Sequence, residues 1–194
     1  MQQVRTQSRR ELYSEATRAA LLDEATRLFA TRGYAGTSLE DVAAASQVTR
    51  GAVYHHFDGK QALFEAVLDA QETRAIARIT AAATAADPLN EALQALDAFL
   101  DQCCDPVYSR LVWLEGPTAL GWHRWRECEQ KYAYGLVERF ITALVDAGYL
   151  ADRALGSLVR FSFWMLGGAG LALAEAPEAD RPRLREEWRR RYER

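Results

Sequence analysis

Helical periodicity is the feature that most constrains the fold of this 194-residue chain. In nearly every long segment, apolar residues recur three and four positions apart, which places them on one face of an α-helix. No alternating polar and apolar run is bounded by hairpin turn residues, the pattern that would predict β-strands. The sequence therefore predicts an all-α protein.

Three helices are expected near the N-terminus. From Thr17 to Arg32 the apolar residues repeat at helical spacing, and a glycine follows where a helix commonly ends. Thr37 and Glu40 have the spacing of a capping box, which predicts a short second helix over residues 38–45. After a brief turn, Thr49 is a possible N-cap for a third short helix.

The third helix is expected to display one face and to pack with the other. Residues three or four apart share a side of a helix. The displayed residues are Arg50, Gly51, Tyr54 and His55. The packing residues are Val53 and Phe57. Two short helices joined by a tight turn are the plan of a helix-turn-helix, in which the second helix enters the major groove of DNA.

Each displayed residue type suits contact with DNA. Arg50 can reach guanine O6 and N7 or a phosphate, and His55 is expected to be a second base reader. Gly51 has no side chain, so it lets the helix approach the bases closely. Phosphate contacts, which position a protein without reading sequence, are expected from Thr49, Tyr54 and Lys60.

Residues 17–68 resemble the DNA-binding region of the tetracycline-repressor (TetR) family of bacterial transcription regulators. The stretches that carry the resemblance are LFATRGYAGTSLEDVA from Leu28 and VTRGAVYHHFDGKQALF from Val48. The resemblance implies DNA contact from Thr37, Thr49, Arg50, Gly51, Tyr54, His55 and Lys60. One position departs from the family, which most often has glycine in the turn where this chain has Gln47. A left-handed Gln47 would cost roughly 1 kcal/mol relative to glycine.

The rest of the chain is expected to form a second, larger helical domain. A fourth helix begins near Lys60 and continues toward the break at Asp87-Pro88, so the predicted domains are residues 1–60 and 61–194. Further helices are expected over about 89–104, 107–115, 123–147, 151–174 and 182–192. The family resemblance implies that this domain dimerises and binds a small molecule. Residues 108–130 also resemble one recurrent subgroup of such domains.

Candidate ligand-binding residues are polar groups in apolar surroundings, together with nearby tryptophans. Burying a polar group without a partner is costly, so such residues are good candidates for a pocket. The candidates are Asp97, Trp113, Glu115, Trp122, His123, Trp125, Arg160 and Trp164. The alternatives are ordinary core packing for the aromatic residues and salt bridges between helices for the charged ones.

Two apolar stripes are expected to form a homodimer interface. The stretch over residues 161–174 is shorter than the about 20 apolar residues that span a bilayer, which favours a buried helix. Small residues that would admit a partner helix are Gly167, Gly168 and Gly170. A second stripe consists of Leu184, Trp188 and Tyr192. The sequence thus predicts a two-fold, four-helix interface through the C-terminal helices.

Charge and cysteine content limit the function classes. The formal net charge of −3 gives no overall positive field, so any site for nucleic acid must be local. Three cysteines, an odd number, fit a reducing cytoplasm. The adjacent His55 and His56 are residues of a metal-ligand type, but neighbouring helical residues point about 100° apart and no further ligand has suitable spacing. We therefore expect no metal and no cofactor.

The predicted function is a ligand-responsive transcriptional repressor that binds a palindromic operator as a homodimer and is released by a small molecule. No nucleophile with its base, paired carboxylates at a cleft or phosphate loop indicates an enzyme. Two alternatives stay open: a helical ligand carrier or enzyme with an inactive head, and a DNA-binding activator without a ligand. The N-terminal arginines Arg5, Arg9 and Arg10 either enter a minor groove or form a disordered arm.

Overall fold

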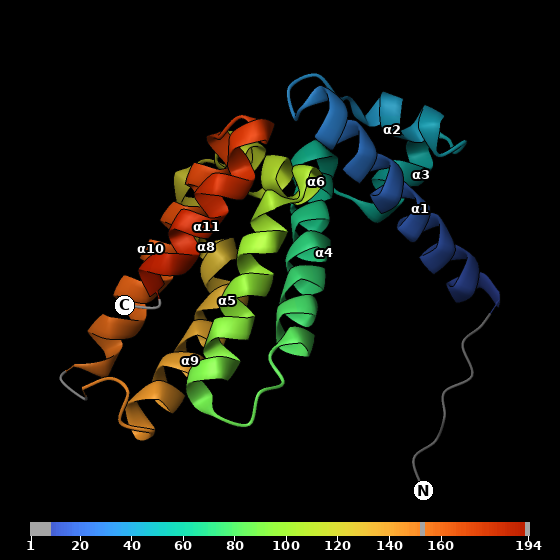
Figure 1. Ribbon diagram of the computed structural model, residues 1–194. Coiled ribbons are helices and arrows are strands. Elements are labelled where there is room, and N and C mark those ends of the chain that lie inside the picture. Colours follow the sequence, from blue (N-terminus) through green and yellow to red (C-terminus); the bar gives the residue numbers. More distant parts are fainter. Residues whose placement is uncertain (1–8, 152–153, 193–194) are drawn as a thin grey trace, which may run out of the picture. The chain divides into compact units, whose positions relative to one another are not determined.

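The computed structural model describes residues 9–151 and 154–192, and it is built from helices (Figure 1). No β-strand occurs within these two ranges. The predicted all-α class is therefore confirmed. The chain divides into two compact units, residues 1–67 and 68–194, which meet inside one helix a few residues after the predicted division at residue 60. Of the predicted N-terminal arm, Arg5 lies outside the described residues.

The N-terminal unit consists of helices around an aromatic and aliphatic core. Its elements are α1 (Arg9–Arg32), α2 (Leu39–Ala45), α3 (Arg50–His56) and the first part of α4 (Gly59–Ala82). Helix α2 packs against both α1 and α3. The ring of Phe29 meets that of Phe64 edge-on at 5.1 Å, a favourable aromatic geometry that joins α1 to α4. Val53 and Phe57 are buried, as predicted.

Helix α1 begins at Arg9, earlier than the predicted start at Thr17. Its first turns, RRELYSEA, include Leu12 and Tyr13, whose side chains are exposed. Most described side chains of these turns are exposed, and the turns lack the apolar repeat that marks a buried helix face. Arg10 is therefore helical and exposed, and it does not belong to an extended arm.

The predicted capping box of α2 is wrong by one residue. Ser38 is the N-cap, and its Oγ accepts a hydrogen bond from the Asp41 backbone N–H at 3.1 Å. The Asp41 carboxylate accepts one in return from the Ser38 N–H at 2.9 Å, and the Ser38 hydroxyl lowers the pKa of this carboxyl. Thr37 and Glu40 have the same spacing as Ser38 and Asp41, so spacing alone does not choose between the two pairs.

The turn between α2 and α3 contains a residue in the left-handed region. Gln47 has a φ of 55°. This conformation costs a residue with a side chain about 1–2 kcal/mol, whereas glycine adopts it freely. The turn therefore keeps the left-handed conformation that the departure from glycine had put in doubt.

The C-terminal unit is a bundle of helices joined by short segments. Its elements after α4 are α5 (Pro88–Cys104), α6 (Pro106–Tyr108), η1 (Ser109–Glu115), α7 (Gly116–Leu120), α8 (Trp122–Glu129), η2 (Gln130–Tyr134), α9 (Gly135–Asp146), α10 (Leu155–Glu175), η3 (Glu178–Asp180) and α11 (Arg181–Tyr192). Helix α5 packs against α9, α10 and α11 (Figure 1). The predicted helix positions are close to these. One difference is that α4, which was expected to continue toward Asp87-Pro88, ends at Ala82, and a loop precedes α5.

Two of the predicted helices contain π-helical segments. η1 makes up most of the helix predicted over 107–115, and η2 interrupts the one predicted over 123–147. A π-helix shifts the register of every residue after it, and such segments are often found at functional sites. The regular period on which the sequence prediction relied contains no signal for them.

Close packing within the chain explains one of the glycines predicted at a dimer interface. A Cβ at Gly170 would lie 2.5 Å from Cε2 of Trp113, so this glycine lets α10 approach η1. The prediction that Gly170 admits a partner helix is therefore wrong. Gly168 has no neighbour within 4 Å of a Cβ position and stays open.

Helix α10 is longer than its apolar core sequence suggested. By length and composition alone it could cross a membrane, so the expectation that this stretch is too short does not hold. Its packing against η1, α9 and α5 places it in the bundle, and a core helix can have the same composition.

Candidate functional site

The display face of α3 is exposed in the structure, as predicted. Tyr54 is 48% exposed, and the neighbouring Arg50, Gly51 and His55 are exposed too. Thr49 is the N-cap, and its Oγ1 accepts a hydrogen bond from the Ala52 N–H at 3.2 Å. The hydroxyl proton of an N-cap threonine stays available as a donor. The first turn of α3 therefore offers donors and one cation on a single surface.

Arg50 is held in place by residues on both helices of the helix-turn-helix. Its Nη1 lies 2.8 Å from Oε1 of Glu40 on α2, and its Nη2 donates to the Tyr54 hydroxyl at 3.2 Å. The guanidinium also lies over the Tyr54 ring, 5.4 Å from its centroid. The Tyr54 hydrogen bond and then the Glu40 charge raise the pKa of Arg50. The Glu40 carboxylate thus occupies part of the Arg50 guanidinium. A DNA phosphate or a guanine would have to compete with Glu40 for those N–H donors.

Two further predicted DNA contacts are placed differently. The Lys60 ammonium lies 4.3 Å from the centroid of the Tyr34 ring, and Lys60 is only partly exposed. Thr37 is 2% exposed, and its hydroxyl donates to the Gly33 carbonyl at 2.9 Å. Because the Thr37 side chain closes the end of α1, it presents no surface to DNA, and the resemblance-based assignment fails for this side chain.

Gly51 is not required by packing within the unit. A Cβ there would meet only Thr49 Oγ1, at 3.8 Å, which is an ordinary contact distance. Core packing therefore does not require a glycine here, and its effect is to keep this part of the exposed α3 surface free of a side chain.

The adjacent histidines of α3 differ in their surroundings. The rings of His55 and His56 lie 5.1 Å apart. Burial, and then the charges of His55 and Arg18, lower the pKa of His56. Among the described residues, no group of three or more His, Cys, Asp or Glu side chains is arranged to hold a metal ion.

A second candidate site is a cavity of about 340 Å³ inside the C-terminal unit. Side chains from α4 to α6, from η1 and from α8 to α10 line it, and most of them are apolar. Three of the predicted ligand-binding residues are among the lining: Trp113, Trp125 and Trp164. The polar side chains of the lining are Glu72, Tyr108, Glu129 and Ser162.

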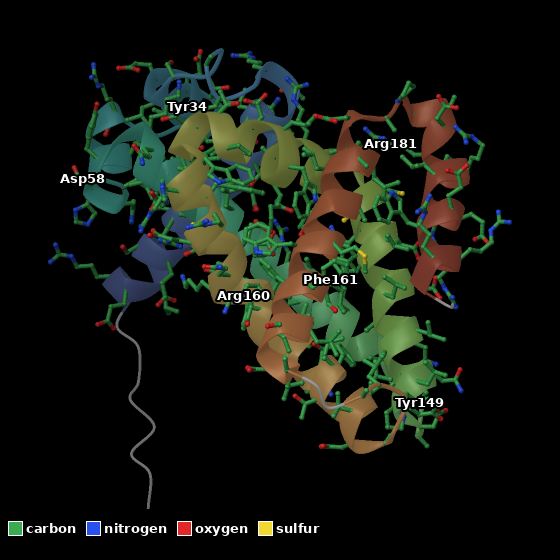
Figure 2. The ribbon with its side chains drawn as sticks, turned by 90° about the vertical axis from the view of Figure 1, so that its left-hand side faces the viewer. Tyr34, Asp58, Tyr149, Arg160, Phe161 and Arg181 are labelled. Carbon is green, nitrogen blue, oxygen red and sulfur yellow. The ribbon has the colours of Figure 1, made fainter. Side chains whose placement is uncertain are left out.

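Five of the predicted ligand-binding residues do not line this cavity. Trp122 is 54% exposed, and His123 is also at the surface. Arg160, on α10 (labelled in Figure 2), is exposed as well. Its neighbour Phe161 is 63% exposed yet belongs to the lining, which places it at the rim of the cavity.

The other two residues of that set form ion pairs. Asp97 accepts from Arg185 at 2.9 Å and from Arg189 at 2.8 Å, and these bonds hold α11 on α5. Glu115 lies 3.6 Å from Arg110. The salt-bridge alternative therefore describes both acids better than the pocket prediction does.

The sequence prediction missed two buried glutamates in the cavity wall. Glu72 is 2% exposed and accepts a hydrogen bond from the Tyr108 hydroxyl at 2.9 Å. Burial raises the pKa of Glu72 to about 7. Glu129 is 7% exposed, and burial together with the charge of Glu72 raises its pKa well above the usual range. The sequence contained a signal for Glu72. Leu68, Ala75 and Ile79 flank it at helical spacing, which places this acid on an apolar helix face.

Comparison with known proteins identifies the family. Residues 89–190, more than half of the chain, match a family model described as the tetracycline repressor-like C-terminal domain. Residues 21–67 match the model for bacterial regulatory proteins of the tetR family. The chain belongs to the TetR family. The N-terminal TetR match covers the second half of α1, all of α2 and α3, and the first part of α4.

Two curated relatives are similar over about two fifths of this chain. A transcriptional repressor of Mycobacterium tuberculosis is 44% identical over 79 residues, which is 41% of this chain and 42% of that protein. The regulator TtgR of Pseudomonas putida is 42% identical over 78 residues, 39% of this chain and 37% of TtgR. The chain thus matches about two fifths of the length of these relatives.

A solved structure matches the TetR-family chain over nearly its whole length. A TetR-family transcriptional regulator from Pectobacterium atrosepticum aligns with a TM-score of 0.80 and 28% identity, covering 96% of this chain and 94% of that one. The predicted resemblance to the family is therefore confirmed for both units.

Proposed function

We propose that this TetR-family chain is a ligand-responsive transcriptional repressor. It binds a palindromic operator as a homodimer in the cytoplasm, and a small molecule in the cavity of the C-terminal unit releases it. Residues 1–60 serve as the DNA-binding domain, and residues 61–194 serve ligand binding and dimerisation. It carries out no catalytic reaction.

The observation that carries the proposal is the exposed face of α3. Arg50, Tyr54 and His55 are displayed there, while Val53 anchors the same helix in the core. A helix fixed on one side and carrying an arginine, a tyrosine and a histidine on the other suits insertion into the major groove. The proposed DNA contacts are Thr49, Arg50, Gly51, Tyr54, His55 and Lys60.

The cavity and the helix α4 support ligand response. α4 carries Lys60 in its first turn and Glu72, Ile76 and Ile79 in the cavity wall. A ligand that changes the conformation of α4 can therefore change DNA binding through one continuous helix. A coupling of about 1–3 kcal/mol, or about 5- to 150-fold in affinity, is typical of allosteric proteins and suffices for release.

The homodimer proposal places two copies of α3 on successive half-sites. Half-sites one helical turn apart lie roughly 34 Å from centre to centre. Exposed apolar and small residues remain on α10 for contact with a second copy: Phe161, Gly168 and Leu171.

Selection from random DNA duplexes tests the proposal. We expect the full-length protein to enrich a palindromic motif at a fixed salt concentration, and Arg50→Ala to lose the enrichment. Arg27→Ala is the matched control, because Arg27 is an exposed arginine of the same unit whose partner is the nearby Glu24. Failure of the wild-type protein to enrich any motif would favour a ligand carrier with an inactive head. A promoter assay then distinguishes repression from activation.

A further inference from the structure

The cavity of the C-terminal unit combines an apolar wall with two buried acids. Glu72, on α4, and Glu129, on α8, both belong to the lining, and each is more than nine-tenths buried. No lysine, arginine or histidine is among the lining residues in the described part of the chain. The wall therefore offers two acidic groups and apolar surface but no basic side chain.

The carboxyl group of Glu129 has no hydrogen-bond or ion-pair partner among the described residues of the chain. Glu72 has one hydrogen-bond donor, the Tyr108 hydroxyl. Buried carboxylates normally receive several hydrogen bonds or a cation, because an uncompensated charge in a dry site is costly. An unsatisfied, buried acid that faces a cavity of ligand size is what a site for a positively charged molecule would contain.

Within the described part of the chain, no cationic side chain contributes to the pKa shift of either acid. Tyr108 on α6 and Cys103 on α5 lie near Glu72, and burial, followed by the charge of Glu72, raises the pKa of both. Both groups are therefore neutral at physiological pH, and neither can replace a cation.

We infer that this cavity binds an organic cation with an apolar body, whose charged group lies beside the Glu72 and Glu129 carboxyl groups. The inference rests on the proposed function, and it names the ligand class of that regulator. The cationic group supplies the missing counter-charge, and the apolar body displaces water from the aromatic and aliphatic wall. An anion of similar shape supplies no counter-charge and would repel either acid in its ionised form in a dry site.

Proton release should accompany binding. Burial and mutual repulsion favour the protonated form of both acids in the empty cavity. A permanent cation binds the ionised form better, so its arrival displaces a proton. Its affinity should then rise by up to about tenfold per pH unit near neutrality, if one proton is released.

Three decyl compounds that share one apolar chain separate the charge from the apolar body. The probes are the permanent cation decyltrimethylammonium, the neutral 1-decanol and the anion decanoate. In calorimetric titrations of the full-length protein at neutral pH, we expect the cation to bind at least about tenfold more tightly than decanol and decanoate to bind more weakly than either. Titration in two buffers of different ionisation enthalpy should show release of about one proton with the cation alone.

Matched variants locate the effect in the cavity wall. Glu129→Gln should weaken binding of the cation by about tenfold or more and leave the binding of decanol unchanged, which also shows that the variant is folded. Glu127→Gln is the control, because Glu127 is an exposed glutamate on the same helix and is absent from the lining. Glu127→Gln should bind all three compounds as the wild-type protein does.

Several results would overturn the inference. Decanol or decanoate binding as tightly as the cation, or a cation affinity that Glu129→Gln does not change, would show that the acids do not select the ligand. Absence of binding by the cation would do the same. None of these results would touch operator selection by α3, which tests the proposed repressor separately.

Discussion

Replacing Glu72 by glutamine should remove a large part of the pH dependence of stability. The pKa of Glu72 is about 7 in the folded protein, against an ordinary value near 4.5, so the folded state holds its proton more tightly than the unfolded state does. The stabilisation that comes from a raised carboxyl pKa is fully present at pH values below the unfolded-state pKa. That stabilisation is lost as the pH rises from about 4.5 through about 7.

The magnitude follows from the two pKa values. Between about pH 5 and about pH 8, this one group should lower the free energy of unfolding by roughly 2–3 kcal/mol. For a chain of this size, the change corresponds to a fall in Tm of about 4–12 °C. Glu129 acts in the same direction, and a neutral residue 72 removes the charge that raises the pKa of Glu129.

Thermal unfolding at a fixed protein concentration and several pH values checks the prediction. The Tm of the wild-type protein should fall between about pH 5 and about pH 8. The Tm of Glu72→Gln should fall clearly less over the same interval. Glu127→Gln should follow the wild-type curve, because water solvates an exposed carboxylate in both states. Parallel curves for the wild-type protein and Glu72→Gln would show that burial does not perturb this carboxyl group and would refute the reasoning.

Three other substitutions test separate parts of the structure. Gln47→Gly relieves the left-handed turn, and we expect the Tm to rise by about 2–4 °C, whereas an unchanged or lower Tm would show that the turn is not strained. Glu40→Gln frees Arg50 from its carboxylate partner, so operator affinity in a fluorescence titration should rise about two- to fivefold; a loss of affinity would contradict the proposed contact. Gly170→Ala brings a Cβ against Trp113 and should cost about 1–3 kcal/mol in denaturant unfolding, and wild-type stability would disprove the close packing.

The helix-turn-helix could be predicted from the sequence because its signals are local. Val53 and Phe57 are four residues apart and both are apolar, whereas Arg50 and Tyr54, also four apart, are polar, so residue type and spacing together predicted which pair is buried. The capping residue was predicted less well, since Thr37 and Ser38 are both followed at the right spacing by an acid. Only the packing of Thr37 into the end of α1 decides which of the two is the cap.

The ligand cavity could be predicted only in part because distant segments build it. Trp113, Trp125 and Trp164 were found by their aromatic content, which suits both a core and a pocket. Glu72 lies in α4, and Glu129 lies in α8 just before a π-helical segment, so no local pattern relates these two residues. Asp97 is an error of the opposite kind. It was predicted as a pocket residue because it is polar within an apolar stripe, but it forms an ion pair with Arg185 of α11.

The most direct test of ligand-responsive DNA binding is the operator affinity of the wild-type protein, with and without saturating decyltrimethylammonium. Fluorescence anisotropy with the selected duplex at constant salt measures it, and Glu129→Gln at the same ligand concentration is the control. We expect the cation to raise the Kd of the wild-type complex by about 5- to 150-fold and to change that of Glu129→Gln much less. A wild-type Kd that stays constant while calorimetry shows the cavity to be occupied would contradict coupling between the cavity and α3.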